Sequence, residues 1–105
     1  MIEKSPKEIE SLINENEKII ILDVREKWEY DICHIKNSLN IPMGQLVDRI
    51  DEFDKSDLYV IVCHHGIRSR MVGLYFEQND FKNIINLRGG IDSWAKTVDS
   101  SMATY

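Results

Sequence analysis

The sequence lacks any hydrophobic run that approaches the roughly twenty residues of a membrane-spanning helix. Its first residues, Met1 to Ser5, include one basic side chain, that of Lys4, and no apolar stretch follows them as in a signal peptide. These absences favour a cytoplasmic protein that has no membrane as a partner. Because thiols persist in that reducing compartment, we expect the cysteines to be reduced.

Cysteine is scarce, and basic residues are outnumbered. The two cysteines, Cys33 and Cys63, are too few for a disulfide framework and lack the close pairing of a zinc knuckle. The 18 acidic and 13 basic residues give a net charge of -5, which disfavours nucleic acid as a partner. With 105 residues, 43% of them apolar, and with no repeat or linker, residues 1–105 are expected to form one domain.

Strand-like and helix-like segments alternate along the chain. Residues 18–23 and 58–62 are short, β-branched and continuously apolar, which is typical of strands covered on both faces. Ser5, Pro6 and Glu8 form a helix-start signal. The pattern predicts an α/β fold with a central parallel sheet flanked by helices on both faces.

The remaining predicted elements follow the same alternation. The first helix is expected to end near residues 14–16, and further elements are a short helix at 26–30, an extended segment at 39–41 and a strand at 84–87. We expect helices with apolar faces carrying Leu46, Ile50 and Phe53, then Met71, Leu74 and Tyr75, then Ile91 and Trp94. Trp28, Tyr30, Trp94 and the Met71, Leu74 and Tyr75 face are expected in the core.

Cys63 directly follows the apolar segment 58–62. In open parallel sheets, ligand sites gather at the carboxyl ends of the strands. The short segment after Cys63 contains Gly66 and leads into the next helix, so its backbone N–H groups can converge on an anion. Those amides and the charge of Arg68 favour the thiolate, which is the nucleophilic form of cysteine. We therefore predict that Cys63 is a reactive nucleophile.

Three segments resemble motifs of the rhodanese family. Residues 63–69, with the sequence CHHGIRS, resemble its active-site loop, in which four residues separate a cysteine from an arginine. Residues 23–42 resemble its amino-terminal signature, and residues 87–105, with Trp94 and Tyr105, resemble its carboxyl-terminal signature. Three motifs in the family's order are far more specific than any one of them.

The resemblance implies a single rhodanese-like domain with sulfurtransferase activity of the thiosulfate:cyanide class. Cys63 would take a sulfur atom from a small-molecule donor such as thiosulfate, hold it as a persulfide, and pass it to cyanide, a thiol or a protein. Arg68 would clamp the oxygen atoms of the donor. This chemistry requires no metal and no organic cofactor. The implied substrate-binding residues are His64, His65, Gly66, Ile67, Arg68 and Ser69.

Other functions stay open at this point. One is a sulfur-relay module that a partner protein loads for thiolation of a cofactor or tRNA; residues 92–105 resemble rhodanese domains fused to activating enzymes of sulfur-carrier pathways. Another is a phosphatase or arsenate reductase of related fold, in which five residues separate the cysteine from the arginine. The four residues between Cys63 and Arg68 give a tighter ring, which suits a sulfur atom. A silent binding module is disfavoured by the intact cysteine.

Polar residues outside the loop receive structural interpretations. Asp23 and Arg25 are expected to form a local ion pair, with support of the active-site loop as the alternative. Cys33 stands where the family usually has glycine, and we expect a structural thiol; a resolving role and a disulfide with Cys63 stay open. His34 is expected to be a hydrogen-bonded structural histidine. A zinc site that combines these cysteines with neighbouring histidines is disfavoured, because no Cys-x-x-Cys pair occurs.

Overall fold

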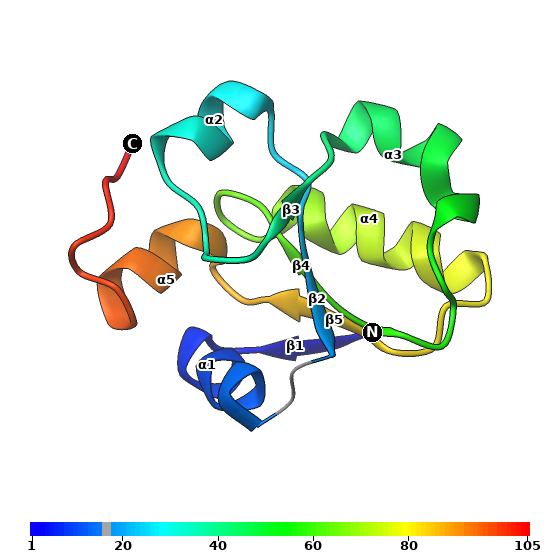
Figure 1. The fold of residues 1–105 in the computed structure, drawn as a ribbon, viewed down its shortest axis with the longest axis horizontal. Coiled ribbons are helices and arrows are strands. Elements are labelled where there is room, and N and C mark those ends of the chain that lie inside the picture. Colours follow the sequence, from blue (N-terminus) through cyan, green and yellow to red (C-terminus); the bar gives the residue numbers. More distant parts are fainter. Residues whose placement is uncertain (16–17) are drawn as a thin grey trace.

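Five short strands form one sheet in the order β1-β5-β4-β2-β3, and every neighbouring pair is parallel (Figure 1). The computed structural model describes residues 1–15 and 18–105. The strands are β1 (Ile2–Lys4), β2 (Ile19–Asp23), β3 (Leu39–Asn40), β4 (Leu58–Val62) and β5 (Ile84–Leu87). The helices are α1 (Pro6–Glu15), α2 (Lys27–Ile32), α3 (Met43–Arg49), the 3-10 turn η1 (Ile50–Glu52), α4 (Ile67–Gln78) and α5 (Gly90–Thr97).

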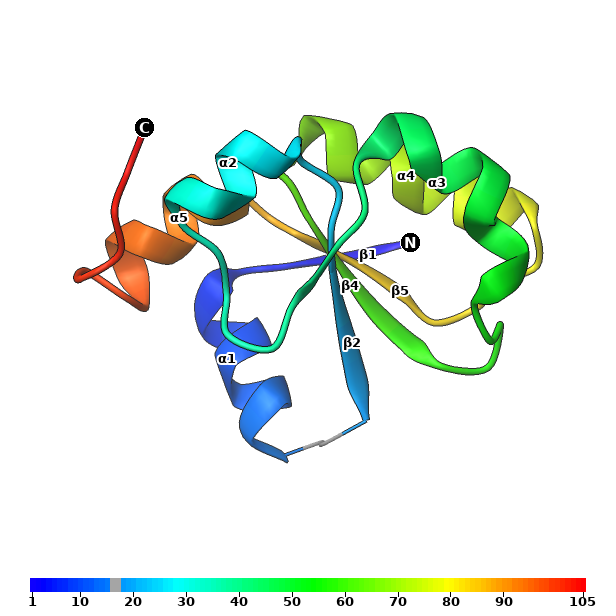
Figure 2. The same cartoon turned by 45° about the horizontal axis from the view of Figure 1, so that its top comes forward.

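Helices cover both faces of the sheet, as predicted (Figure 2). One core packs the sheet against α3 and α4, and the other packs it against α1 and α5. In β4, Tyr59 and Ile61 belong to the first core, whereas Val60 and Val62 belong to the second. A strand that is buried on both faces needs apolar side chains at every position, which explains the continuous apolar run.

The start of α1 follows the predicted signal. The N–H of Glu8 donates to Ser5 Oγ at 3.3 Å, and the N–H of Ser5 donates to Glu8 Oε1 at 2.9 Å, which is a reciprocal capping box. The helix ends at Glu15, inside the predicted range, and the later limit of that range, Asn16, lies outside the described residues. The strand β1 was not predicted, because three residues at the start of the chain carry no recognisable pattern.

The predicted core is wrong at three positions, and two more of its members, Tyr30 and Tyr75, are only partly buried. Trp28 is 62% exposed, and Met71 and Leu74 lie largely in solvent although large apolar side chains were expected to mark the buried face of their helix. The face that α4 does bury has the spacing i, i+3, i+4, i+7 but includes small and polar residues, so hydrophobicity alone selected the wrong face. Its buried residues are Ser69, Val72, Gly73 and Phe76. Trp94 is buried as predicted.

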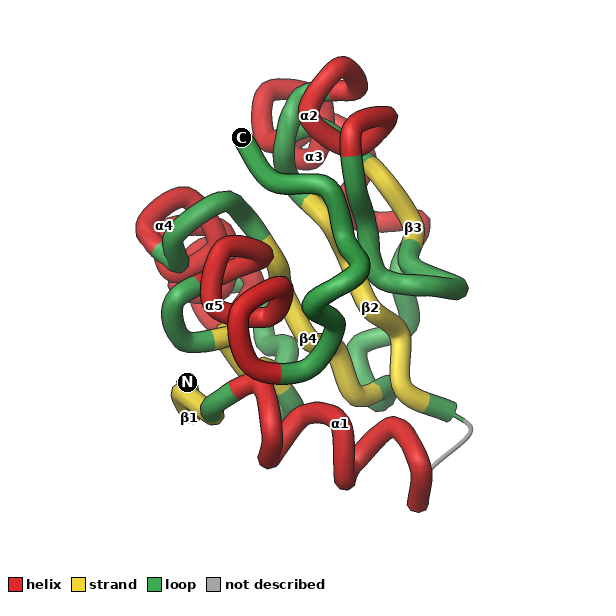
Figure 3. The backbone as a smooth tube through the Cα atoms, turned by 90° about the vertical axis from the view of Figure 1, so that its left-hand side faces the viewer, coloured by secondary structure: helices red, strands yellow, loops and turns green. Residues whose placement is uncertain are grey.

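The carboxyl ends of β2, β4 and β5 meet at one edge of the sheet. The register pairs Asp23 with Val62 across β2 and β4, and Ile61 with Asn86 across β4 and β5. Figure 3 shows the segment after α5 returning along the molecule toward α2. Among the described residues, no helix has both the length and the apolar character needed to cross a membrane.

Candidate active site

Cys63 lies at the base of the loop that follows β4. Its side chain is 1% exposed, and its Sγ accepts a hydrogen bond from the backbone N–H of Gly66 at 3.0 Å. Gly66 has a φ of 98°, in the left-handed region that favours glycine, so the chain turns tightly back toward the sulfur. An N–H donor at this distance stabilises negative charge on the sulfur atom of a thiolate.

A hydroxyl and an amide continue the contacts of Cys63 into the protein. Ser69 Oγ lies 3.2 Å from Cys63 Sγ and donates to Asn86 Oδ1 at 2.5 Å, and all three side chains are buried. Asn86 Nδ2 donates to the carbonyl oxygen of Gly66 at 3.1 Å. Because a hydroxyl has one proton, Ser69 accepts from the thiol while it bonds to Asn86, and it can donate to the sulfur once the thiol is ionised.

The start of α5 fixes the same loop from the other side. The N–H of Ile91 donates to the carbonyl of Cys63 at 2.8 Å, and the N–H of Asp92 donates to the carbonyl of His64 at 3.1 Å. Gly90 has a φ of 63°, and a Cβ atom there would overlap with both carbonyl groups. The position of the loop therefore depends on a glycine at residue 90.

His64 and His65 form the outer rim of the loop together with Tyr105. The rings of His64 and Tyr105 stack with centroids 4.0 Å apart, and the rings of His64 and His65 stack at 3.9 Å. Burial, together with the neighbouring His65, lowers the pKa of His64, so its ring is neutral at pH 7. Ile67 is 70% exposed. Of the predicted binding residues, Gly66 and Ser69 thus contact the sulfur, whereas His64, His65 and Ile67 lie on the outside of the loop.

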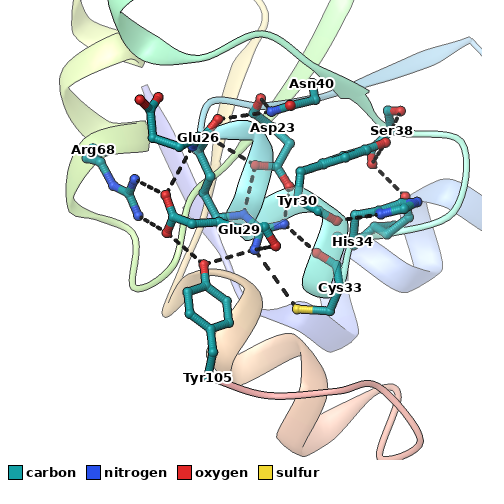
Figure 4. A network of polar contacts seen from close by, with 12 residues as sticks. Asp23, Glu26, Glu29, Tyr30, Cys33, His34, Ser38, Asn40, Arg68 and Tyr105 are labelled. Carbon is teal, nitrogen blue, oxygen red and sulfur yellow. Dashed lines mark hydrogen bonds and ion pairs between the residues drawn. The ribbon is translucent and has the colours of Figure 1, made fainter.

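Arg68 is engaged by a carboxylate. Its Nη1 and Nη2 donate to the two oxygens of Glu29 at 2.7 and 2.9 Å, and Figure 4 shows the two groups facing each other. The hydrogen bonds from Arg68 lower the pKa of Glu29, burial opposes this effect, and the N–H of Glu26 adds to it, so that the pKa falls to about 2. The Tyr105 hydroxyl also donates to Glu29, at 2.8 Å. The clamp on donor oxygens that the sequence assigned to Arg68 stays a prediction, and it would require this pair to open.

A second arginine, Arg25, is fully buried beneath this pair. Its guanidinium donates to both oxygens of Asp23 at 2.9 and 2.7 Å, which is the predicted local ion pair. Its other N–H groups donate to the carbonyls of Glu29 and Cys33 and to the Tyr105 hydroxyl, so all five donors have acceptors. Burial opposes the charge, but the hydrogen bonds to Asp23 and Tyr105 outweigh it and raise the pKa of Arg25. Support of the active-site loop by Asp23 and Arg25 stays a prediction.

The second cysteine lies among these groups. Cys33 is buried, its Sγ is 4.0 Å from Arg25 Nη1, and both cysteines are free thiols in the structure. His34 Nδ1 lies 2.8 Å from the carbonyl oxygen of Tyr30, and the two rings stack at 3.9 Å. This geometry agrees with the structural interpretation of His34.

One group of side chains has the composition of a metal site. His64, His65 and Asp92 offer ligand atoms that all lie within 4.8 Å of one another. Asp92 also accepts a hydrogen bond from Lys96 at 3.0 Å, which already neutralises its carboxylate. The group differs from the zinc site weighed in the sequence, because it contains neither cysteine.

Sequence reasoning missed three residues of the site. Glu29 had a usable signal, because a glutamate three residues after Glu26 completes a capping box at the start of α2. Asn86 had another, because it is a polar residue inside the apolar strand β5, where an amide must find partners. Tyr105 was part of a motif, but nothing in its surroundings indicated that it reaches across to α2.

The fold and the active-site loop together define the class of protein. The protein is a parallel α/β domain whose cysteine, at the carboxyl end of a central strand, is held by the backbone of a short loop that leads into a helix. The family model described as a rhodanese-like domain matches residues 5–97. The chain therefore belongs to the rhodanese-like family.

Individual relatives agree with this membership. The chain is 37% identical to YrkF of Bacillus subtilis, named for a sulfur-carrier function, over 78% of this chain and 44% of YrkF. It is 34% identical to the thiosulfate sulfurtransferase GlpE of Coxiella burnetii over 72% of this chain and 71% of GlpE. A rhodanese-like domain protein from Staphylococcus aureus has a similar structure, with a TM-score of 0.83 and 33% identity, over 90% of this chain and 91% of that one. The chain thus spans less than half the length of YrkF.

Proposed function

We propose that this protein is a sulfurtransferase in which Cys63 carries the transferred sulfur atom as a persulfide. The observation that carries the proposal is the hydrogen bond of 3.0 Å from the Gly66 N–H to Cys63 Sγ, in a loop where this thiol is buried. Membership of the rhodanese-like family and the similarity to GlpE support the same reaction.

The transfer has two steps. The Cys63 thiolate attacks the outer sulfur of a donor such as thiosulfate, a new S–S bond forms, and the old S–S bond breaks as sulfite leaves with the electron pair. An acceptor, either cyanide, a thiol or a protein, then attacks the outer sulfur of the persulfide and releases the Cys63 thiolate. The Gly66 N–H stabilises the Cys63 thiolate, which attacks in the first step and is released in the second. No metal or organic cofactor takes part in either step.

A sulfur relay is the second candidate function. The similarity to YrkF, which is named for a sulfur-carrier function, favours a domain that a partner protein loads and that passes sulfur on for thiolation of a cofactor or tRNA. Both functions use the same Cys63 persulfide. Both also need a free thiol, which persists in a reducing compartment such as the cytoplasm.

Intact-mass measurement tests the persulfide. After incubation with thiosulfate or with glutathione persulfide, the wild-type protein is expected to gain the mass of one sulfur atom and to lose it again when cyanide is added. Cys63→Ser is expected to gain nothing, because a hydroxyl at that position is not ionised at neutral pH. Cys33→Ser is the matched control and is expected to load normally. A wild-type mass that stays unchanged with both donors contradicts the proposal.

A further inference from the structure

The Glu29 carboxylate occupies the guanidinium of Arg68, which is the formal positive charge that the sequence assigned to binding a donor. Both end nitrogens of Arg68 point at the Glu29 carboxylate, in a bidentate arrangement with distances of 2.7 and 2.9 Å. This geometry uses the fork of the guanidinium that would otherwise recognise a sulfonate. A donor with sulfonate oxygens must therefore compete with a carboxylate that belongs to the protein.

Glu29 is itself held in place. Its Oε1 also accepts the N–H of Glu26 at 3.0 Å, its Oε2 also accepts the Tyr105 hydroxyl at 2.8 Å, and its side chain is 6% exposed. If Arg68 swung away to a donor, the carboxylate would stay buried without its cation, which is unfavourable. The fixed carboxylate thus keeps Arg68 where it is.

Two further arginines near the loop also have acidic partners. Arg70 donates to Glu3 Oε1 at 2.7 Å, and Arg25 is paired with Asp23. His64 is neutral at pH 7, and His65 faces Asp92 at 4.0 Å. Neither Arg68 nor Arg70 then has an uncommitted guanidinium next to the loop, which disfavours a donor whose charge lies on sulfonate oxygens.

We propose that Glu29 determines donor specificity: by occupying Arg68 it selects donors that carry a persulfide over donors that carry a sulfonate, such as thiosulfate. The inference rests on the proposed function and narrows its donor class. In the favoured step, the Cys63 thiolate bonds to the outer sulfur of R–S–S⁻ and the donor S–S bond breaks. The inner sulfur of the donor leaves as a thiolate that takes a proton from water, the negative charge stays on the new persulfide, and no external oxidant or reductant is consumed.

Donor selectivity measures the effect of Glu29. The quantity is the ratio of kcat/KM for loading by thiosulfate to kcat/KM for loading by glutathione persulfide. We expect Glu29→Gln to raise this ratio about tenfold, because glutamine still accepts hydrogen bonds but no longer neutralises Arg68. Glu52→Gln removes the same charge from an exposed pair between Glu52 in η1 and Arg49 in α3, and it is expected to leave the ratio unchanged.

A double variant shows whether the gain passes through Arg68. Glu29→Gln combined with Arg68→Ala is expected to return the ratio to within about threefold of the wild type, because no guanidinium remains to bind a sulfonate. A rise that persists in the double variant overturns the inference, as does an unchanged ratio in Glu29→Gln. If Glu29→Gln does not fold, the double variant alone tests the inference. A ratio of thiosulfate to persulfide loading about tenfold below the wild-type ratio would mean that Arg68 already binds thiosulfate in the wild type, which overturns the inference.

The inference and the proposed function fail in different ways. Absence of sulfur on Cys63 with both donors refutes the proposed function. Loading by both donors, with a selectivity that does not respond to Glu29→Gln, refutes the role of Glu29 alone.

Discussion

The two cysteines are both buried at the same edge of the sheet, but they differ in the hydrogen-bond donors that surround their sulfur atoms. Cys63 Sγ accepts a backbone N–H at 3.0 Å and lies 3.2 Å from the Ser69 hydroxyl oxygen. The Cys33 Sγ lies 4.0 Å from Arg25, but that guanidinium is saturated by shorter contacts, and it is the Cys33 carbonyl that takes a strong hydrogen bond, at 2.7 Å. Burial is therefore common to both cysteines, and the backbone N–H donor at the sulfur is what sets Cys63 apart.

The regions also differ in what holds them together. Around Cys33 the structure depends on charge, because Arg25 ties β2, α2 and the C-terminal Tyr105 into one network. Around Cys63 it depends on backbone conformation, because glycines at 66 and 90 allow the loop and the start of α5 to approach each other. Substitutions can therefore disturb one region and spare the other.

The largest expected effect on stability is at Arg25. Arg25→Ala leaves Asp23 buried without a cation and removes five hydrogen bonds, so the free energy of unfolding is expected to fall by about 3–5 kcal/mol. Urea denaturation measures the change. Arg49→Ala breaks an exposed pair with Glu52 and is expected to cost less than about 1 kcal/mol. Equal losses in the two variants would show that the buried network does not organise the Cys33 region.

A smaller effect on stability, with a larger effect on transfer, is expected at Gly90. Gly90→Ala places a Cβ against the carbonyls of Cys63 and His64 at a positive φ, which is expected to cost about 2 kcal/mol. The loop must shift, so the rate of persulfide formation should fall at least about tenfold. Gly44→Ala in α3 meets no atom within 4 Å and should stabilise the protein by about 0.5–1 kcal/mol. Full activity in Gly90→Ala would mean that α5 does not position the loop.

The same contrast explains what could be predicted from the sequence. The strands β2 to β5, the loop and the local pair of Asp23 and Arg25 each depend on residues close together in the chain, and their patterns are visible there. The contacts of Glu29 with Arg68 and Tyr105 join positions 39 and 76 residues apart, which no local pattern reports. The buried face of α4 was misjudged for a related reason, since Ser69 is buried by its role beside Cys63 and not by hydrophobicity.

The smallest expected effect is at Cys33 and tests whether this thiol has any role in the chemistry. Cys33→Ala removes a buried sulfur that has no close donor, so a loss of about 1 kcal/mol in the free energy of unfolding is expected, with unchanged persulfide loading at Cys63. After mild oxidation with hydrogen peroxide, Cys63 should recover its activity with dithiothreitol at the same rate in this variant as in the wild type. Because the network fixes the Cys33 backbone through its carbonyl, the side chain can change without moving Arg25. Slower recovery without Cys33, or a Cys33–Cys63 disulfide in the oxidised wild type, would instead make Cys33 a resolving thiol and remove the distinction between the two cysteines.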